Sequence, residues 1–350
     1  MNFSSKIINS NFLIRLRNWE YWPMEIVYIP VMFYWLWLSI KARSPFFFSA
    51  SNPGIEFGGM LGESKIKILK KIDDELKPKT LYFNQNVSIE EVLNKIEDAS
   101  LSFPLIFKPD IGERGLMVEK IDTEAAATNY VDSIKMNFLV QEYIDLPIEL
   151  GVFYFRYPNR SAGRISSIVI KEFLKITGDG KSTIRNLIRK NPRAKLQLDV
   201  LEHKYGAEME SILPMAKEKL LVPIGNHCKG AAFLDGGKRI TKKMTRSFDK
   251  IAKEIDGFFI GRFDLKCESW EDLEDGNMKI MELNGSGAEP GHIYHPGASI
   301  WNAYESLFFH MRVLLRISMI NKKSGVKYLT WKEGWYVFTQ LPTFKKLGFT

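Results

Sequence analysis

The sequence predicts an α+β fold in which antiparallel strands combine with amphipathic helices. Residues 261–266 and 279–285 each alternate apolar and polar side chains, as half-buried strands do. The acidic segment between them, residues 271–277, contains Asp-Gly-Asn and has the composition of a hairpin turn. Residues 88–99 show the period of an amphipathic helix that begins with the Ser-x-x-Glu pattern of a capping box. These features indicate a fold built from both sheets and helices.

The predicted hairpin carries polar side chains with the chemistry of a metal site. Because side chains alternate between the two faces of a strand, Asp264 shares its face with Arg262. By the same period, Glu282 shares its face with Asn284. Asp264, Glu282 and Asn284 would then supply hard oxygen ligands, which Mg²⁺ prefers together with phosphate oxygens. Arg262 would add a fixed positive charge, whereas the alternative is a solvated polar face on an edge hairpin.

The composition indicates what class of protein this is and what kind of partner it is expected to bind. The chain of 350 residues is long enough for two or three lobes, and its 45% hydrophobic and 26% charged content is that of an ordinary globular protein. A net charge of +8 favours an anionic partner such as a nucleotide or a membrane surface, and no arginine-rich run or aromatic platform indicates nucleic acid. With only Cys228 and Cys267, neither a disulfide framework nor a cysteine-based zinc site is expected. The N-terminus lacks the pattern of a signal peptide, so we expect a cytoplasmic protein.

Residues 1–84 form an aromatic region that we expect to contact a membrane. Residues 21–40 are almost entirely apolar or aromatic, and a helix of this length spans about 30 Å, enough for the core of a bilayer. Glu25 and Pro30 are costly inside lipid, and both flanks of the segment are basic. We therefore expect the segment to lie on the inner face of the membrane rather than to span it. The alternative is a buried aromatic helix.

Residues 45–64 are expected to form a short strand that runs into a glycine-rich loop. Gly58, Gly59 and Gly62 would let backbone N–H groups approach a ligand, with a helix that begins near Ser64 behind them. The spacing of these glycines matches no phosphate-binding pattern, so an ordinary loop is an equal alternative.

A candidate phosphate-binding lysine closes the next predicted strand. Residues 103–110 form this strand, and Lys108 stands just before a glycine-bearing turn. A lysine in this position can reach a phosphate group while the turn covers it. A helix over residues 123–134 and a strand over residues 138–144 are predicted to follow.

The order of these motifs carries a resemblance to a known superfamily. The strand with Lys-Pro and its glycine turn is followed by a helix, a strand with Gln-Glu-Tyr-Ile, then Arg-x-Asp and Glu-x-Asn-Gly. This order resembles the ATP-grasp superfamily, in the style of D-alanine–D-alanine ligases and cyanophycin synthetase. Lys171 and the runs 178–188 and 225–230 resemble members similar to cyanophycin synthetase. The resemblance extends over residues 85–310.

The resemblance implies an ATP-grasp fold that holds ATP between two α+β lobes, at residues 85–145 and 146–320. Lys108 and Lys171 would contact the phosphates, the backbone of residues 142–144 would face the adenine edge, and Glu149 would bind the ribose. The implied ATP-binding residues are Lys108, Glu142, Tyr143, Ile144, Glu149, Lys171, Asn226 and Lys229.

The same resemblance implies a role for the polar hairpin. Asp264, Glu282 and Asn284 would hold Mg²⁺ or Mn²⁺. Arg262 and Lys171 would be the catalytic residues, with Arg262 stabilising an acyl phosphate and the tetrahedral intermediate that follows it.

The implied reaction joins a carboxylate to an amine through an acyl phosphate and releases ADP and phosphate. The carboxylate is expected on a small molecule or on a lipid- or glycan-linked compound of the cell envelope. One alternative is an ATP-grasp phosphotransferase, and another is a membrane-associated nucleotide-binding protein without turnover.

The remaining segments depart from the resemblance or lie outside it. His292 and His295 follow the predicted metal site and would either orient the acceptor or simply pack. A helical insert is expected near residues 190–222 and a core helix over 299–319, followed by a basic, aromatic extension over 321–350.

Overall fold

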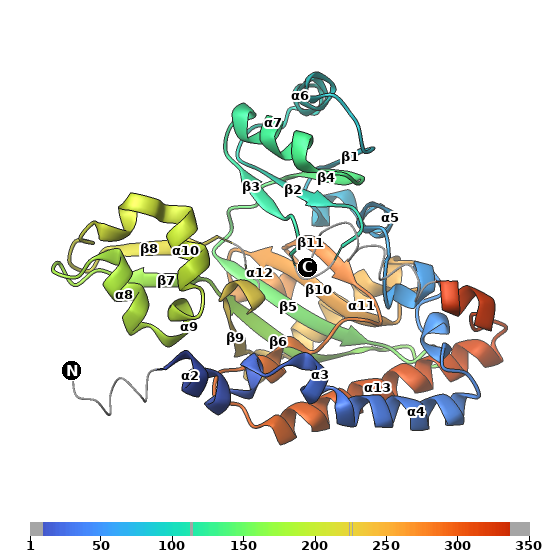
Figure 1. Cartoon of the computed structure of the whole chain (residues 1–350). Coiled ribbons are helices and arrows are strands. Elements are labelled where there is room, and N and C mark those ends of the chain that lie inside the picture. The colour runs from blue at the N-terminus through green and yellow to red at the C-terminus, as the bar shows by residue number, and fades with distance from the viewer. Residues whose placement is uncertain (1–9, 113–114, 224, 226, 337–350) are drawn as a thin grey trace.

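Two antiparallel sheets form the framework of the computed structural model, which describes residues 10–112, 115–223, 225 and 227–336 (Figure 1). The four-stranded sheet has the order β1-β4-β2-β3, with β1 (Thr80–Phe83), β2 (Leu105–Pro109), β3 (Glu119–Ile121) and β4 (Phe138–Glu142). The five-stranded sheet has the order β11-β10-β5-β6-β9, with β5 (Ile148–Phe155), β6 (Arg164–Glu172), β9 (Ala232–Asp235), β10 (Ile260–Cys267) and β11 (Lys279–Asn284). A two-stranded sheet pairs β7 (Leu174–Thr177) with β8 (Glu218–Val222).

Helices α6 (Ile89–Asp98) and α7 (Glu124–Ser133) cover the four-stranded sheet and confirm both helices predicted for this region (Figure 1). Ser88 caps α6 by accepting a hydrogen bond from the backbone N–H of Glu91, as the capping pattern predicts. Apolar side chains of the helices, such as Val92 and Tyr130, are buried against Phe107 and its neighbours on the strands. This lobe therefore has a core of its own.

The two faces of the five-stranded sheet differ in chemistry. One face is apolar throughout, and Phe263 on β10 packs there against Phe248 of α11 (Lys242–Glu254). On the other face, Phe153 of β5 and Ile260 of β10 are buried beneath the long helix α13 (Ile300–Lys323). The rest of that second face carries polar side chains such as Arg262 and Asp264, and Lys108 of the four-stranded lobe reaches the neighbouring strand β11.

The N-terminal region is a chain of short helices on the outside of α13. It consists of α2 (Asn11–Arg17), η1 (Trp19–Tyr21), α3 (Met24–Val27) and α4 (Ile29–Ala42). Pro23 and Pro30 stand at the starts of α3 and α4, where a proline is tolerated, so the apolar run 21–40 is not one continuous helix. None of the described helices combines the length and apolar character that crossing a bilayer requires.

The strand predicted within residues 45–64 is wrong. These residues form the 3₁₀ turns η2 (Phe47–Ala50) and η3 (Glu56–Gly59) and the start of α5 (Lys65–Leu69). Consecutive residues of a strand point to opposite faces, whereas Phe47 and Phe48 are both buried in the cluster around α4 and α13. The glycine-rich loop is held by main-chain hydrogen bonds, because the N–H of Gly287 donates to the carbonyl of Gly59 at 2.8 Å.

The strands of the predicted hairpin pair as expected, but their connection does not form a simple turn. Residues 271–277 fall largely within α12 (Trp270–Asp275), which joins β10 to β11. Ser269 caps this helix, Leu273 anchors it in the core, and Gly276 ends it in the left-handed conformation with a φ of 86°. The helix-capping pattern of Ser269 and Asp272 therefore decides the structure of this segment, although its composition is typical of a turn.

The segment near residues 190–222 builds a small lobe around β7 and β8. It contains α9 (Pro192–Lys195), α10 (Leu198–Tyr205), η5 (Gly206–Glu210) and strand β8, and it follows α8 (Ile184–Lys190). Ile188, Leu201 and Met209 lie in its own buried cluster. The short turns η4 (Asp74–Leu76), η7 (Gly237–Arg239) and η8 (Gly291–Tyr294) complete the fold, and residues 337–350 of the predicted extension lie outside the described part of the chain.

Asn52 joins the N-terminal region to the five-stranded sheet. Its side chain is fully buried, and its amide nitrogen donates to the carbonyls of Gly58 at 2.9 Å and Ile260 at 2.8 Å. Its oxygen accepts from the backbone N–H groups of Phe259 and Ile260 at 2.8 and 3.0 Å. This one amide therefore satisfies main-chain groups of two segments that are distant in sequence.

We expect Asn52→Ala to lower the free energy of unfolding by about 2–4 kcal/mol, because it leaves buried main-chain groups without partners. Urea denaturation would measure the change. The matched variant Asn302→Ala, at an exposed position of α13, should change the free energy by less than about 0.5 kcal/mol. Equal effects of the two variants would contradict the anchoring role of Asn52.

Candidate functional site

The candidate site occupies the polar part of the second face of the five-stranded sheet. Gly151 on β5 lies directly opposite Asp264 on β10 in the strand register. A Cβ atom at Gly151 would lie 2.7 Å from Cγ1 of Val169 and 3.1 Å from Oδ1 of Asp264. Only a glycine therefore leaves room for the charged side chains that lie above β5.

The register between β10 and β11 brings together the polar residues of the predicted metal site. Arg262 is paired with Asn284, and Asp264 with Glu282, so all four side chains belong to one face of the sheet. The register shifts after Asp264 and leaves Met281 without a partner on β10. This irregularity frees the carbonyl of Met281 for a contact with the other lobe.

Asp264 is the buried centre of this group. Its oxygens accept from Nη2 of Arg262 at 2.9 Å and from the amide nitrogen of Asn284 at 2.9 Å, and Nζ of Lys171 lies 3.2 Å from Oδ1. Burial alone would raise the pKa of Asp264, but the charges of Arg262 and Lys171 outweigh it and hold the pKa well below its ordinary value. The carboxylate is therefore ionised across the neutral range.

Lys171 on β6 lies between two carboxylates. Its Nζ is 3.2 Å from Asp264 and 3.2 Å from Oε1 of Glu149 on β5. Burial opposes the charge of Lys171, yet the two carboxylates raise its pKa above the ordinary value. Gly225 covers the pair closely, because a Cβ there would lie 2.4 Å from Oε1 of Glu149. Glu149, which is predicted to bind the ribose, and Lys171, which is predicted to bind a phosphate, are thus neighbours covered by Gly225.

Lys108 reaches the site from the four-stranded lobe. Its Nζ donates to Oε1 of Gln141 at 2.8 Å and to the carbonyl of Met281 at 3.2 Å, and so it bridges the two sheets. Burial lowers the pKa of Lys108 to about 8, against the opposing effect of Glu282. A buried lysine held mainly by neutral groups has capacity for an anionic ligand.

Lys65 is a residue of the site that the sequence patterns did not single out. Asp110 positions it, because its carboxylate accepts from Oγ of Ser64 at 2.7 Å and from the backbone N–H of Ile66 at 2.9 Å at the start of α5. The Nζ of Lys65 lies 3.8 Å from Oε1 of Glu282. The sequence indicated only that a helix begins near Ser64. No pattern in the sequence linked Lys65 to Glu282.

Lys266 is a second cation that the sequence patterns did not single out, one alternation beyond Asp264 on β10. Its Nζ donates to the carbonyl of Ile144 at 2.9 Å and lies 3.9 Å from Oε2 of Glu149. It also lies 5.2 Å from the ring centre of Tyr143, and burial lowers its pKa. The same period that singled out Asp264 would have placed Lys266 on this face.

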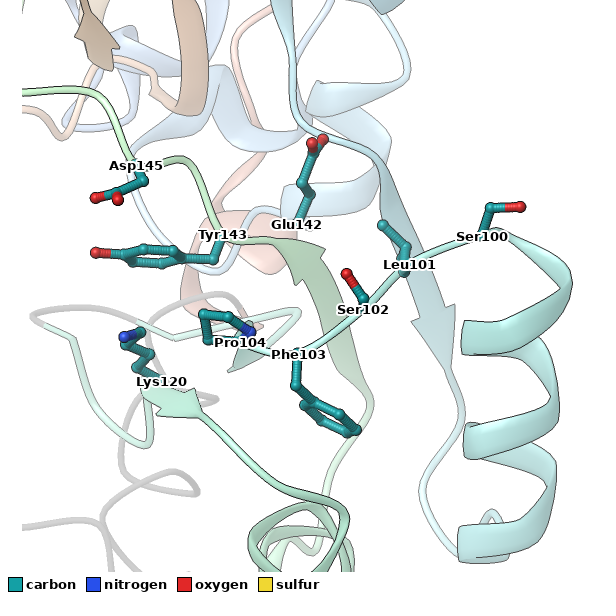
Figure 2. A pocket seen from close by; sticks show the side chains of 9 residues that line it. All are labelled: Ser100, Leu101, Ser102, Phe103, Pro104, Lys120, Glu142, Tyr143 and Asp145. Carbon is teal, nitrogen blue, oxygen red and sulfur yellow. The ribbon is translucent and has the colours of Figure 1, made fainter.

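The predicted adenine-binding segment, residues 142–144, borders a cavity of about 470 Å³ (Figure 2). Residues 100–104 line the cavity from the other side. Figure 2 shows Tyr143, Asp145 and Lys120 on one side of this cavity, while Glu142 points another way. The carboxylate of Glu142 accepts from the backbone N–H of Lys79 at 3.1 Å. The backbone N–H of Glu142 also donates to the carbonyl of Lys79 at 2.9 Å, so both groups of Glu142 secure the start of β1.

The loop before β9 is tied to the N-terminal region. Glu20 accepts from Nη2 of Arg193 at 2.8 Å, and Nε2 of His227 lies 2.7 Å from the same carboxylate. Burial raises the pKa of Glu20, but His227 and Arg193 outweigh it and lower the pKa overall. Lys229 follows in η6 (His227–Lys229), where burial lowers its pKa, whereas Asn226 lies outside the described residues.

The two histidines after Asn284 have partners in the fold. Nδ1 of His292 lies 2.6 Å from Oγ of Ser167, and burial lowers the pKa of this imidazole. Nδ1 of His295 accepts from the backbone N–H of Asp235 at 3.1 Å. These contacts favour the packing alternative for both residues.

The donor set fits a magnesium ion that shares its ligands with phosphate. Within the described ranges, no three His, Cys, Asp or Glu side chains come together in a group that could hold a metal. Two carboxylates and one amide do meet at Asp264, Glu282 and Asn284, and the Glu282 side chain is 33% exposed. Mg²⁺ is commonly bound by one or two carboxylates together with substrate phosphates. The assignment of these residues stays a prediction.

Residues 64–150 match the model of the RimK-like ATP-grasp domain. The matched segment begins at the cap of α5 and ends within β5, so it contains Lys65, Lys108 and Glu149. No curated protein matches the sequence.

The matches to solved structures have low sequence identity and low TM-scores. A bifunctional glutathione synthetase from Pasteurella multocida has 15% identity and a TM-score of 0.36, over 70% of this chain and 35% of that one. The VanG D-Ala:D-Ser ligase from Enterococcus faecalis has 15% identity and a TM-score of 0.42, over 73% and 61%. A D-alanine–D-alanine ligase from Bacillus anthracis has 12% identity and a TM-score of 0.42, over 75% and 69%.

We expect Asp264→Asn to lower the free energy of unfolding by about 3–5 kcal/mol at neutral pH, because it removes the shared partner of buried Arg262 and Lys171. Glu282→Gln should cost less than about 1 kcal/mol, since the ion pair of Glu282 with Lys65 is long and partly exposed. Urea denaturation of both variants tests the difference.

The pH dependence gives a second check on the same variants. Because folding lowers the pKa of Asp264, its contribution is present above the pKa of an unfolded aspartate and is lost as the pH falls through the folded value. The gap between wild type and Asp264→Asn should therefore narrow in acid. A gap independent of pH would contradict the ion-pair role.

Proposed function

We propose that this chain, which has the ATP-grasp fold and carries a RimK-like ATP-grasp domain over residues 64–150, is an ATP-dependent ligase that joins a carboxylate to an amine. The family match confirms the fold predicted from the motifs. The observation that carries the proposed activity is the hydrogen bond from Lys108 of one lobe to the carbonyl of Met281 on β11 of the other, the strand beside the Lys171–Asp264–Arg262 group. Such a site can hold a polyphosphate between two sheets.

The basic side chains of the site support ATP as the first substrate. Lys65, Lys108 and Lys171 approach the same region from α5, β2 and β6. Charge-assisted hydrogen bonds from such groups bind phosphate oxygens strongly. Lys108 donates to neutral oxygens and can exchange these for phosphate oxygens. Glu149 would accept hydrogen bonds from the ribose hydroxyls in this proposal.

Asp264, Glu282 and Asn284 would hold Mg²⁺ or Mn²⁺ in this proposal. These residues would hold the ion so that it could supply neutralising charge to the phosphates. The charges of Arg262 and Lys171 lower the pKa of Asp264 and keep it ionised, and Asn284 donates to the same carboxylate and so fixes its orientation.

The proposed chemistry has two steps. A carboxylate oxygen attacks the γ-phosphorus of ATP, the bond to the bridging oxygen breaks, and ADP leaves. The amine nitrogen then attacks the acyl carbon and loses a proton, and inorganic phosphate leaves to give the amide. Arg262 is suited to stabilise the oxyanion of the second step, because its guanidinium is held by Asp264 and by the carbonyl of Glu289 at 3.1 Å.

The direct test is a search for an ATP-dependent gain in mass. Amino acids, amines, uronic acids and lipid- or glycan-linked acids would be incubated with ATP and Mg²⁺, with ADP release and product mass recorded together. An amide product supports the ligase. ADP release with a stable phosphorylated product would instead identify a phosphotransferase, and no turnover with any acid would favour a nucleotide-binding protein.

We expect Glu282→Gln to reduce turnover by about 100-fold or more, because metal-dependent charge stabilisation is worth several kcal/mol. The variant should remain folded, since its ion pair with Lys65 contributes little to stability. The matched control is Glu56→Gln, which removes a carboxylate that pairs with Lys67 at the surface and should leave the rate unchanged. Wild-type turnover by Glu282→Gln at saturating Mg²⁺ would remove Glu282 from the metal site.

We expect ATP affinity to fall as the pH rises through about 8, because Lys108 loses its proton there and the charged form is the one that binds phosphate. Isothermal titration across this range would show the change. Lys108→Arg stays charged throughout and should remove this inflection, whereas Lys108→Met should bind weakly at every pH. A persistent inflection in Lys108→Met would assign it to another group.

A further inference from the structure

Helix α4 presents an apolar face that no described part of the protein covers. Met32, Phe33, Leu36 and Ile40 are 62%, 69%, 56% and 76% exposed. With Ile29 and Trp37, which are also exposed, they follow the i, i+3, i+4 spacing that defines one side of a helix. Between Ile29 and Ile40, every exposed residue of α4 is apolar.

The opposite side of α4 accounts for its packing in the fold. Val31, Leu38 and Ala42 are buried, and α4 lies against α13 in Figure 1. The helix is therefore apolar on both sides, and packing on α13 uses only one of them. The exposed side represents apolar surface beyond what the fold requires.

The neighbouring helices extend this surface. Figure 1 shows α2, α3 and α4 following one another along the same edge of the molecule, beside α13. Phe12 and Leu16 on α2 are 72% and 53% exposed, and Ile26 on α3 is 56% exposed. Phe12 and Leu16 are four residues apart, so they lie on one side of their helix.

Charged side chains flank the apolar side of α4 rather than interrupt it. The exposed residues Arg15 and Arg17 on α2 and Glu25 on α3 precede α4, and the exposed residues Lys41 and Arg43 stand at its end. The Nζ of Lys41 lies 3.5 Å from the ring centre of Trp37, so an aromatic ring and a cation meet where the apolar face ends. Such pairs suit the boundary between hydrocarbon and headgroups.

We propose that α2, α3 and α4 form a docking surface for a membrane that contains anionic lipids, with the exposed side of α4 inserted among the acyl chains at the interface. The apolar side chains would enter the lipid, and the basic residues at both ends would contact the headgroups. The exposed side of α4 is apolar between Ile29 and Ile40, and four of the five exposed charges named beside it are cations, so it complements an anionic bilayer surface better than it complements a second protein. The inference does not depend on the proposed ligase activity.

The test is flotation of the full chain with vesicles of phosphatidylcholine, with and without phosphatidylglycerol. We expect binding to the anionic vesicles that weakens as salt is added, because the basic residues contribute by charge. The double variant Phe33→Ser/Leu36→Ser should weaken this binding by about tenfold or more, since it removes inserted apolar groups.

A matched control distinguishes binding through this surface from non-specific binding through exposed apolar residues elsewhere. Val200→Ser/Met215→Ser changes apolar residues that are 67% and 69% exposed on the small lobe, and it should bind vesicles as the wild type does. Circular dichroism of each variant checks folding. Equal binding by Phe33→Ser/Leu36→Ser and wild type, or no binding by wild type at low salt, would overturn the proposal.

Size-exclusion chromatography with light scattering addresses a protein partner. If the exposed side of α4 instead joins two copies of the chain, the wild type will form a dimer that Phe33→Ser/Leu36→Ser dissociates, and vesicles will not bind. That outcome would also overturn the membrane assignment. A monomer that binds anionic vesicles supports it.

Discussion

The burial of the Asp264 carboxylate is the constraint around which the five-stranded sheet is arranged. A buried charge is tolerated only when oppositely charged and hydrogen-bonding groups surround it. Its partners Arg262, Lys171 and Asn284 lie on β10, β6 and β11, so the register of several strands must be correct at once. Gly151 meets the same requirement from β5, since any larger residue would occupy the space of these side chains.

The contrast between the lysines explains how a polar site remains open between two lobes. Lys171 is neutralised by Glu149 and Asp264, and its pKa is raised, so it belongs to the protein's own charge balance. Lys108 is buried beside mainly neutral acceptors, and its pKa is lowered. Its charge is therefore poorly compensated by the protein, which is the electrostatic condition expected of a residue that would bind phosphate.

The N-terminal region does more than cover the sheet. Asn52 binds the main chain at the start of β10, and Glu20 binds Arg193 and His227 near the loop that covers Lys171. Both contacts attach this region to elements of the site. Its other side, along α4, remains apolar and exposed, so one segment stabilises the framework of the candidate site and also offers the surface proposed for the membrane.

Local patterns determined much of the fold and of the candidate site. Alternation along a strand is a property of neighbouring residues, so the sequence alone places Arg262 with Asp264, and Glu282 with Asn284, on shared strand faces. The capping residue Ser88 marked the start of α6 for the same reason. The order of motifs then identified the ATP-grasp fold, which the match over residues 64–150 confirmed.

The tertiary structure decided what depends on distant segments. Lys65 meets Glu282 only because Asp110 fixes the start of α5 beside the site, and no local pattern encodes that contact. Phe47 and Phe48 form a helical turn rather than a strand because both rings are buried beside α13. In α4, a helix that is apolar on every side contains no polar stripe to indicate which side faces the core. Packing against α13 made that choice, because burial of one side of a helix depends on the shape of its neighbour and not on its own sequence.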